Sequence, residues 1–342
     1  MNDNLGIASI PAVNQYLDLA KEQEIDFLPI LETLEISTEL LRDNSQHISG
    51  RQFQSLIEQL LIRSEDELFG LHTAKFVQPG SYSVLGYISM NCDTLGQAIT
   101  KIKPFEKLVG DMGITNIEHL GSQLKISWHC QFPNALVRRH MIDNCLASWL
   151  TFARYLVNQD SKPVEVLLTR EKPSLGQQTE YQKLFACPVR FNQADNAILF
   201  STELLELPLN KGDQQLLTTL ESHAQSLIAK LSANESLCQQ ASILIEKNLK
   251  SGNFHQDDIA KLMNLGSKTL QRRLKEENYS FQKLLDDTRL KLAKYLLAEP
   301  TLKLNEISLE LGFAEPRSFY RWFNKLTGQT PGEYRKALDK KQ

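Results

Sequence analysis

The sequence contains few cysteines, and their arrangement predicts neither a disulfide framework nor a zinc site. The five cysteines are scattered, their number is odd, and no Cys-x-x-Cys pair occurs. His129 with Cys130, and His140 with Cys145, do not place two ligands one helical turn apart. No Gly-x-Ser-x-Gly elbow, phosphate-binding loop or dinucleotide-binding glycine motif is present either. We therefore predict no metal, no cofactor and no enzymatic activity.

The sequence also lacks the long hydrophobic runs of membrane and secreted proteins. Nowhere do about eighteen apolar residues follow one another, as a membrane-spanning helix requires. The stretch after Met1 has neither the basic segment nor the apolar segment of a secretory signal. We expect a cytoplasmic protein without a membrane partner.

Net charge is small over the whole chain but unevenly distributed. The 342 residues suffice for two domains, and their formal net charge is −3. Residues 233–342 hold 19 Lys and Arg against 14 Asp and Glu, a net of +5, whereas residues 1–232 hold 19 against 27, a net of −8. This asymmetry predicts that the C-terminal part meets phosphate and the N-terminal part does not.

Residues 1–232 combine helical and strand-like patterns, which predicts an α+β domain. Apolar residues follow the helical period at 13–20 and at 53–61, with Ser49 as the expected cap of the second segment. Further along the chain the patterns predict strands at 81–87, 124–128, 164–168, 189–191 and 197–200, and helices at 94–108, 137–157, 181–185 and 214–230.

Residues 233–342 are predicted to be entirely helical, after a hinge at 233–236. Their first helix-turn-helix unit spans residues 259–274. Its first helix would pack through Ile259, Leu262 and Met263, its turn passes through Leu265 and Gly266, and Ser267 would cap a second helix packed by Leu270 and Leu274. The outward face of that second helix would carry Lys268, Gln271 and Arg272.

A second unit repeats this pattern about forty-five residues later. Leu304, Ile307 and Leu311 would pack its first helix, Gly312 and Phe313 form its turn, and Phe319 and Phe323 would pack its second helix. Pro316 suits the first turn of that helix, whose outward face would carry Arg317 and Arg321. Residues 281–298 form an apolar-striped helix between the units, about 27 Å long. Such a strut can hold two recognition helices about 34 Å apart, one turn of B-DNA.

The C-terminal part resembles the DNA-binding domain of the AraC/XylS family of bacterial transcription regulators over residues 240–336. The similarity lies in residues 267–275, in Phe281 with Arg289, in residues 306–313, and in residues 319–325 followed by Thr-Gly and Thr-Pro. Ser308 departs from the usual Ala. The resemblance implies double-stranded DNA as a partner and base-reading positions at Lys268, Gln271, Arg272, Pro316, Arg317 and Arg321. A proline side chain cannot read a base edge, so the second helix would rely on its two arginines.

Arg289 faces a packed helix, so we expect it to be an ion-pair partner within the domain rather than a phosphate contact. Arg273 and Lys275 are expected to meet phosphate or water.

The N-terminal part resembles the arabinose-binding-like sensing domain found in a subgroup of this family. The similar pieces are residues 79–87, 94–98 and 185–191. This implies an activator controlled by a small-molecule effector, with RNA polymerase and a second copy of the chain as further partners. Because an α+β layer with a helical cover can enclose a ligand, we place the effector near Tyr82, Tyr87 and Trp128, with Trp149 as a further candidate.

Two alternatives to a sensor stay open. The first is a ligand-independent regulator, whose N-terminal domain would only dimerise or contact polymerase. In that case the aromatic residues on the strands would belong to the core alone, as such residues most often do. The other alternative is an enzyme coupled to the DNA-binding module, such as a repair methyltransferase with a reactive cysteine. No cysteine here lies beside a histidine in a nucleophile motif that would support it.

Overall fold

The computed structural model describes residues 5–157, 162–209, 212–233, 236–297 and 302–339. The chain divides into two compact units, Met1–Ile228 and Ala229–Gln342, which we call the front unit and the tail unit. The division falls within helix α11 (Gln214–Ala233), which covers the amphipathic helix predicted at 214–230.

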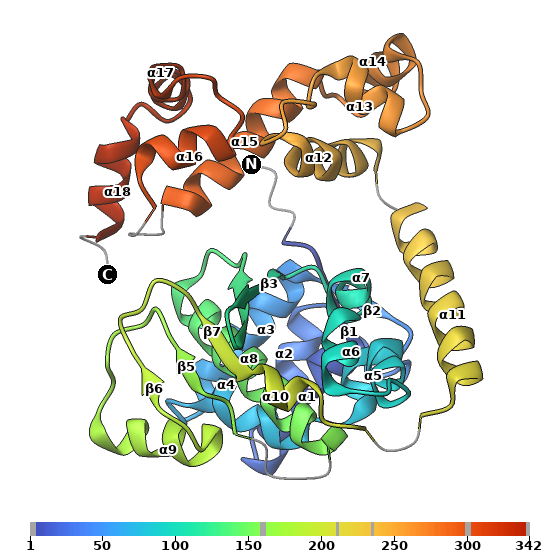
Figure 1. Ribbon diagram of the computed structural model, residues 1–342, viewed down its shortest axis with the longest axis vertical. Helices are drawn as coiled ribbons and strands as arrows, with labels where there is room; N and C mark the ends of the chain where they lie inside the picture. Colours follow the sequence, from blue (N-terminus) through green and yellow to red (C-terminus); the bar gives the residue numbers. More distant parts are fainter. Residues whose placement is uncertain (1–4, 158–161, 210–211, 234–235, 298–301, 340–342) are drawn as a thin grey trace. The chain divides into compact units, whose positions relative to one another are not determined.

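The front unit begins with a helical layer around a short two-stranded sheet (Figure 1). Ser49 caps α3 as predicted: its hydroxyl accepts a hydrogen bond from the Gln52 backbone, and the Gln52 side chain accepts one from the Ser49 backbone. Phe53 and Leu56 on this helix are fully buried. The elements of this layer are β1 (Ile7–Ser9), α1 (Ile10–Glu22), α2 (Leu28–Thr33), η1 (Leu40–Arg42), β2 (His47–Ser49), α3 (Gly50–Arg63), α4 (Phe69–His72) and η2 (Thr73–Phe76).

A five-stranded sheet forms the other part of the front unit, in the order β3-β4-β7-β5-β6. All neighbours are antiparallel except β5 and β6, and Ile126 in the middle of the sheet lies opposite Ile117 and Ile198. Helix α8 (Ala135–Val157) packs against β4, and Figure 1 shows it beside the sheet. The strands are β3 (Gly113–Leu120), β4 (Gln123–Cys130), β5 (Glu165–Leu167), β6 (Val189–Arg190) and β7 (Ala197–Ser201), with α9 (Leu175–Phe185) and α10 (Thr202–Leu205) completing the unit. The α+β fold class is confirmed.

Two local predictions in this unit were wrong. Residues 81–87 form no strand: they belong to η3 (Pro79–Tyr82) and to helix α5 (Ser83–Met90). Gly86 permits this arrangement, because a Cβ there would lie 1.9 Å from the carbonyl oxygen of Pro79. The single helix predicted at 94–108 is three short ones, α6 (Leu95–Thr100), α7 (Ile102–Phe105) and η4 (Glu106–Leu108).

The tail unit is all-helical, and helix α15 (Phe281–Leu297) takes part in both of its cores. The first core joins one end of α15, through Leu284 and Leu285, to helices α12–α14. The second joins the other end, through Ala293 and Leu297, to α16–α18. The other helices are α12 (Leu237–Asn248), α13 (Gln256–Leu262), α14 (Ser267–Glu276), α16 (Leu304–Glu310), α17 (Pro316–Thr327) and α18 (Pro331–Asp339). Two helix-turn-helix units joined by a linker helix are thus confirmed.

Three details of the tail differ from expectation or lie outside the described residues. Leu262 does not pack in the first unit but is 51% exposed. Ser267 does not cap α14: the helix begins at this residue, and its hydroxyl accepts a hydrogen bond from the Gln256 side chain at 2.9 Å. The predicted hinge at 233–236 includes residues 234 and 235, which the structure does not describe.

Candidate nucleic-acid interface and effector cavity

Helix α14 turns three polar side chains toward solvent. Leu270 and Leu274 are fully buried, which fixes the opposite face outward. That outward face carries the predicted base-reading residues Lys268, Gln271 and Arg272, all exposed. The Arg272 Nε lies 3.9 Å from the Glu276 carboxylate, and both side chains are largely exposed. Such a surface pair contributes about 0 to 1 kcal/mol, so it leaves the guanidinium available for another partner.

Helix α17 is built in the same way around Phe319 and Phe323, which are fully buried. Pro316 stands in the first turn as predicted and is half-buried, whereas Arg317 and Arg321 are exposed. Sequence reasoning missed Asn324, which is exposed and continues the stripe of the two arginines by one helical turn. The spacing of seven residues from Arg317 would have indicated it.

Arg289 joins the two halves of the tail unit. Its side chain is buried; Nε donates to the carbonyl oxygen of Leu311 at 3.0 Å and Nη2 to that of Gly312 at 3.4 Å. The guanidinium carbon lies 4.4 Å from the ring centre of Phe254 and 4.6 Å from that of Phe313. The prediction of a structural role is confirmed. In place of the expected ion-pair partner, two carbonyl oxygens accept hydrogen bonds from the guanidinium group. This cation lies between two aromatic rings, which attract it as well.

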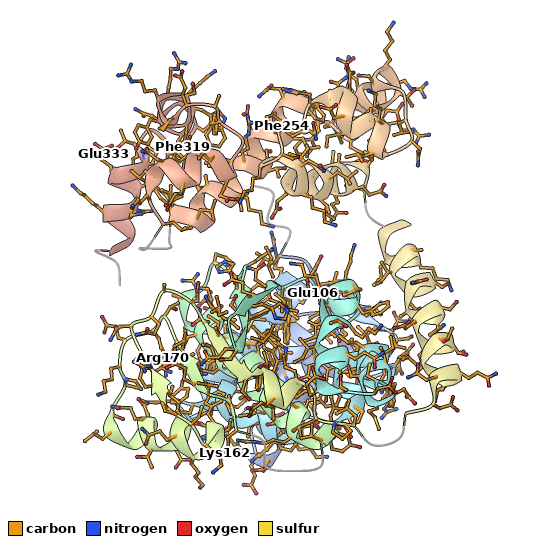
Figure 2. All side chains as sticks on the ribbon, viewed as in Figure 1. Glu106, Lys162, Arg170, Phe254, Phe319 and Glu333 are labelled. Atoms are coloured by element: carbon orange, nitrogen blue, oxygen red, sulfur yellow. The ribbon has the colours of Figure 1, made fainter. Side chains whose placement is uncertain are left out.

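The close approach at this junction explains why a glycine stands at position 312. Gly312 has φ +72°, and a Cβ there would lie 2.5 Å from the carbonyl oxygen of Leu249. An ion pair between Lys250 and Glu310, 2.5 Å long, links the same two segments. In Figure 2, Phe254 lies near the middle of the tail unit and Phe319 at the second helix-turn-helix. Helices α14 and α17 are therefore mounted on one connected body, on either side of α15 (Figure 1).

The front unit contains a cavity of about 160 Å³ between α1, α5, α8 and the strands β3 and β4. Tyr82, Trp128 and Trp149 line it, as the sequence-based hypothesis requires. Tyr87 does not: it lies outside the lining, on α5, and is 49% exposed. Most other lining side chains are apolar, among them Phe53, Leu85, Met141, Phe152 and Phe200.

One wall of the cavity carries a polar cluster that sequence reasoning missed. The Asn144 amide donates to Gln15 Oε1 at 3.1 Å and to Thr73 Oγ1 at 2.6 Å. The Ser148 hydroxyl lies 3.4 Å from the same Gln15 oxygen. Asn144 and Ser148 stand one turn apart on helix α8, and this spacing could have indicated the cluster.

The Tyr82 hydroxyl oxygen is buried and has no hydrogen-bond partner. Burial raises the pKa of Tyr82 well above its usual range; the neighbouring Ser148 hydroxyl opposes this rise but makes no hydrogen bond of ordinary geometry. The ring lies 4.9 Å from that of Phe152, which holds it against α8. Tyr82 is one of the residues that line the cavity, so this unsatisfied polar atom belongs to the cavity wall.

Glu106 is the carboxylate of the lining, and Figure 2 labels it in the front unit near α7 and β3. Burial raises the pKa of Glu106, against hydrogen bonds from Thr115 and the charge of Lys103. Burial also raises the pKa of the Cys145 thiol well above its usual range, so the cysteine of the lining is held as a thiol.

The histidines considered as metal ligands have structural environments. His140 is buried, and its Nδ1 accepts a hydrogen bond from the backbone of Gly70 at 3.1 Å. Burial lowers the pKa of both His140 and His129 to about 3. Within the described ranges, no three His, Cys, Asp or Glu side chains gather as a metal site would need. Nor is any helix in these ranges both long and apolar enough to cross a bilayer.

Comparison with known proteins gives matches to both units. The family model described as "Arabinose-binding domain of AraC transcription regulator, N-term" matches residues 25–209, and a helix-turn-helix domain model matches residues 259–337. The ornithine utilization regulator of Pseudomonas aeruginosa is 22% identical, over 98% of each chain. The HTH-type transcriptional regulator VirS of Mycobacterium tuberculosis is 23% identical over 94% of each chain. Among solved structures, the transcriptional regulator CdpR of P. aeruginosa has a TM-score of 0.44 and 20% identity, covering 90% of this chain and 96% of its own.

Proposed function

Because this chain belongs to the AraC family of transcription regulators, as a member with an arabinose-binding-like N-terminal domain, we propose that a small-molecule effector in the front unit controls its activation of transcription. Regulation of transcription through DNA binding is the function of the family, and the chain is not an enzyme. The finer assignments concern the residues that read DNA, the effector and the further partners.

We assign base reading to the exposed faces of α14 and α17. Arg and Gln side chains can each make two hydrogen bonds to the edge of a guanine or an adenine in the major groove. Gln271 and Arg272 supply these groups on α14, and Arg317 and Arg321 supply them on α17. Lys268 adds a further donor, whereas Pro316 stands in the first turn of α17 and has no side-chain donor for a base edge. The net charge of +5 over residues 233–342 favours phosphate contacts by the remaining cations.

The cavity of the front unit is the proposed effector site, and the unsatisfied Tyr82 hydroxyl is the observation that carries this proposal. A buried polar atom without a partner costs about 1 to 3 kcal/mol, which a bound ligand can recover. We assign ligand contacts to Tyr82, Trp128 and Trp149, which line the cavity. Tyr87 does not line it and is not among the proposed contacts.

We further propose that the regulator works in the cytoplasm on double-stranded DNA, contacts RNA polymerase, and forms a homodimer. The alternative is a ligand-independent regulator whose front unit only dimerises or contacts polymerase. The cavity with its polar wall favours the sensor.

Selection of binding sites from a pool of random duplexes tests the assignment of base reading. The wild-type chain should select a site with two halves about one helical turn apart. Arg272→Ala should relax base preference in one half and Arg321→Ala in the other, each by about 1 to 3 kcal/mol at the affected base pair. Arg273→Ala, an exposed arginine off the predicted face, is the matched control. Uniform loss of affinity for all sequences in both variants would show that these arginines contact only phosphate.

A further inference from the structure

We propose that the cavity is built for a compact, uncharged molecule, about the size of one six-membered ring, with a hydrogen-bond acceptor directed at the Tyr82 hydroxyl. This inference rests on the proposed effector function and adds the chemical class of the effector. Three features of the lining carry it: its volume, its charge and one buried polar atom without a hydrogen-bond partner, the Tyr82 hydroxyl oxygen.

The volume limits the ligand to a small molecule. A cavity of about 160 Å³ is close to the roughly 150 Å³ that holds one benzene molecule in an apolar protein interior. Apolar side chains such as Phe53, Phe152 and Phe200 line it. A single ring with one substituent, or a short chain of equal bulk, fills such a space, whereas a sugar phosphate or a peptide exceeds it.

The charge of the lining excludes anions and zwitterions. Among the described residues that line the cavity, none is Lys, Arg or His. A carboxylate or phosphate on the ligand would therefore be buried without a counter-charge, at a cost of several kcal/mol. Glu106 adds repulsion for an anion. Thr115 already donates hydrogen bonds to the Glu106 carboxyl group, so this group is not available to bind a cationic ligand either.

The polar groups of the lining differ in how well they are already satisfied. Asn144, Gln15 and Ser148 form a cluster of mutual contacts. The Tyr82 hydroxyl, by contrast, is buried with its proton unused. A carbonyl, ether or hydroxyl oxygen of the ligand would accept that proton and remove the penalty.

Four ligands of nearly equal shape test the proposal on the purified full-length chain: benzyl alcohol, toluene, benzoate and benzylammonium. Binding is measured by calorimetry and by the shift in melting temperature. We expect benzyl alcohol to bind the wild-type chain more tightly than toluene by roughly two- to tenfold. Tyr82→Phe should remove this difference while leaving toluene binding unchanged. Tyr87→Phe makes the same chemical change outside the cavity and should preserve the difference.

The outcomes separate this inference from the function on which it rests. Equal or tighter binding of benzoate or benzylammonium would overturn the uncharged class, and a preference for benzyl alcohol that survives Tyr82→Phe would overturn the role of the hydroxyl. Failure of all four ligands to bind would overturn the size and class together. If benzyl alcohol binds as expected but leaves DNA affinity unchanged, the chemistry of the cavity stands and its regulatory function fails.

Discussion

The guanidinium carbon of Arg289 lies 4.4 Å from the ring centre of Phe254, and this contact links the linker helix to the first half of the tail unit. The same guanidinium donates to the carbonyl oxygens at the end of α16, in the second half. One side chain therefore takes part in the mutual placement of the two helix-turn-helix units. Their spacing depends on this junction as well as on α15.

Replacing Arg289 by Met should destabilise the tail unit and weaken DNA binding. The variant loses two hydrogen bonds from a charged donor and two contacts with aromatic rings, together about 3 kcal/mol. Urea unfolding followed by Trp322 fluorescence measures the stability, because Trp322 packs in the second core of the tail unit. Arg273→Met removes an exposed arginine and should have little effect on stability. Equal stability of the two variants would show that Arg289 does not hold the halves together.

Tyr82→Phe should leave the ligand-free protein as stable as the wild type or stabilise it by about 1 kcal/mol. The reason is that the substitution removes a buried hydroxyl without a partner and keeps the ring against Phe152. Thermal unfolding in the absence of ligand provides the measurement. A loss of more than about 1 kcal/mol would mean that the hydroxyl makes a hydrogen bond within the protein, as most buried tyrosines do.

The stability of the front unit should decrease as the pH falls below about 6.5, the pKa of an unfolded histidine. Burial lowers the pKa of His140 to about 3, so below 6.5 the unfolded chain binds a proton that the folded chain does not. The free energy of unfolding then falls by about 1.4 kcal/mol per pH unit for this group. This loss of stability continues until the pH approaches about 3, the pKa of His140 in the folded chain.

His140→Gln tests this linkage, because the Gln side chain can still accept the hydrogen bond from Gly70 without titrating. Urea unfolding between pH 6 and pH 5 should show a slope smaller by about 1.4 kcal/mol per pH unit. Burial also lowers the pKa of His129 to about 3, so His129 accounts for part of the pH dependence that remains in the His140→Gln variant. His119→Gln removes an exposed histidine of the same unit and serves as the control. An unchanged slope in His140→Gln would assign the acid sensitivity to other groups.

The helical framework of the tail, and which of its side chains face outward, could be predicted from the sequence. Leu270 with Leu274 and Phe319 with Phe323 recur at the helical period, and burial of these pairs decides which side chains face outward. The partners of Arg289 were not predictable, since they depend on carbonyl groups and an aromatic ring brought together by tertiary packing. Asn324 was missed, although its spacing of seven residues from Arg317 places it on the same face of the helix.

The front unit was predicted less completely, because local patterns there compete with tertiary packing. Strand β3 is an edge strand in which only Thr115 is buried, so it has no apolar alternation to reveal it. In residues 81–87 the aromatic residues suggested a strand, but Leu85, Ile88 and Ser89 are the buried face of a helix that extends past this window. The cavity arises where such segments meet, and its polar wall comes from α1 and α8 rather than from the strands.

The most direct test of the account is whether filling the cavity changes DNA affinity. The affinity of the full-length chain for its selected operator is measured with and without saturating benzyl alcohol, and its affinity for benzyl alcohol is measured with and without operator. We predict that both affinities change by the same factor, about fivefold or more, and that Tyr82→Phe weakens the effect of a given benzyl alcohol concentration. Benzyl alcohol bound in the cavity with operator affinity unchanged would contradict the account.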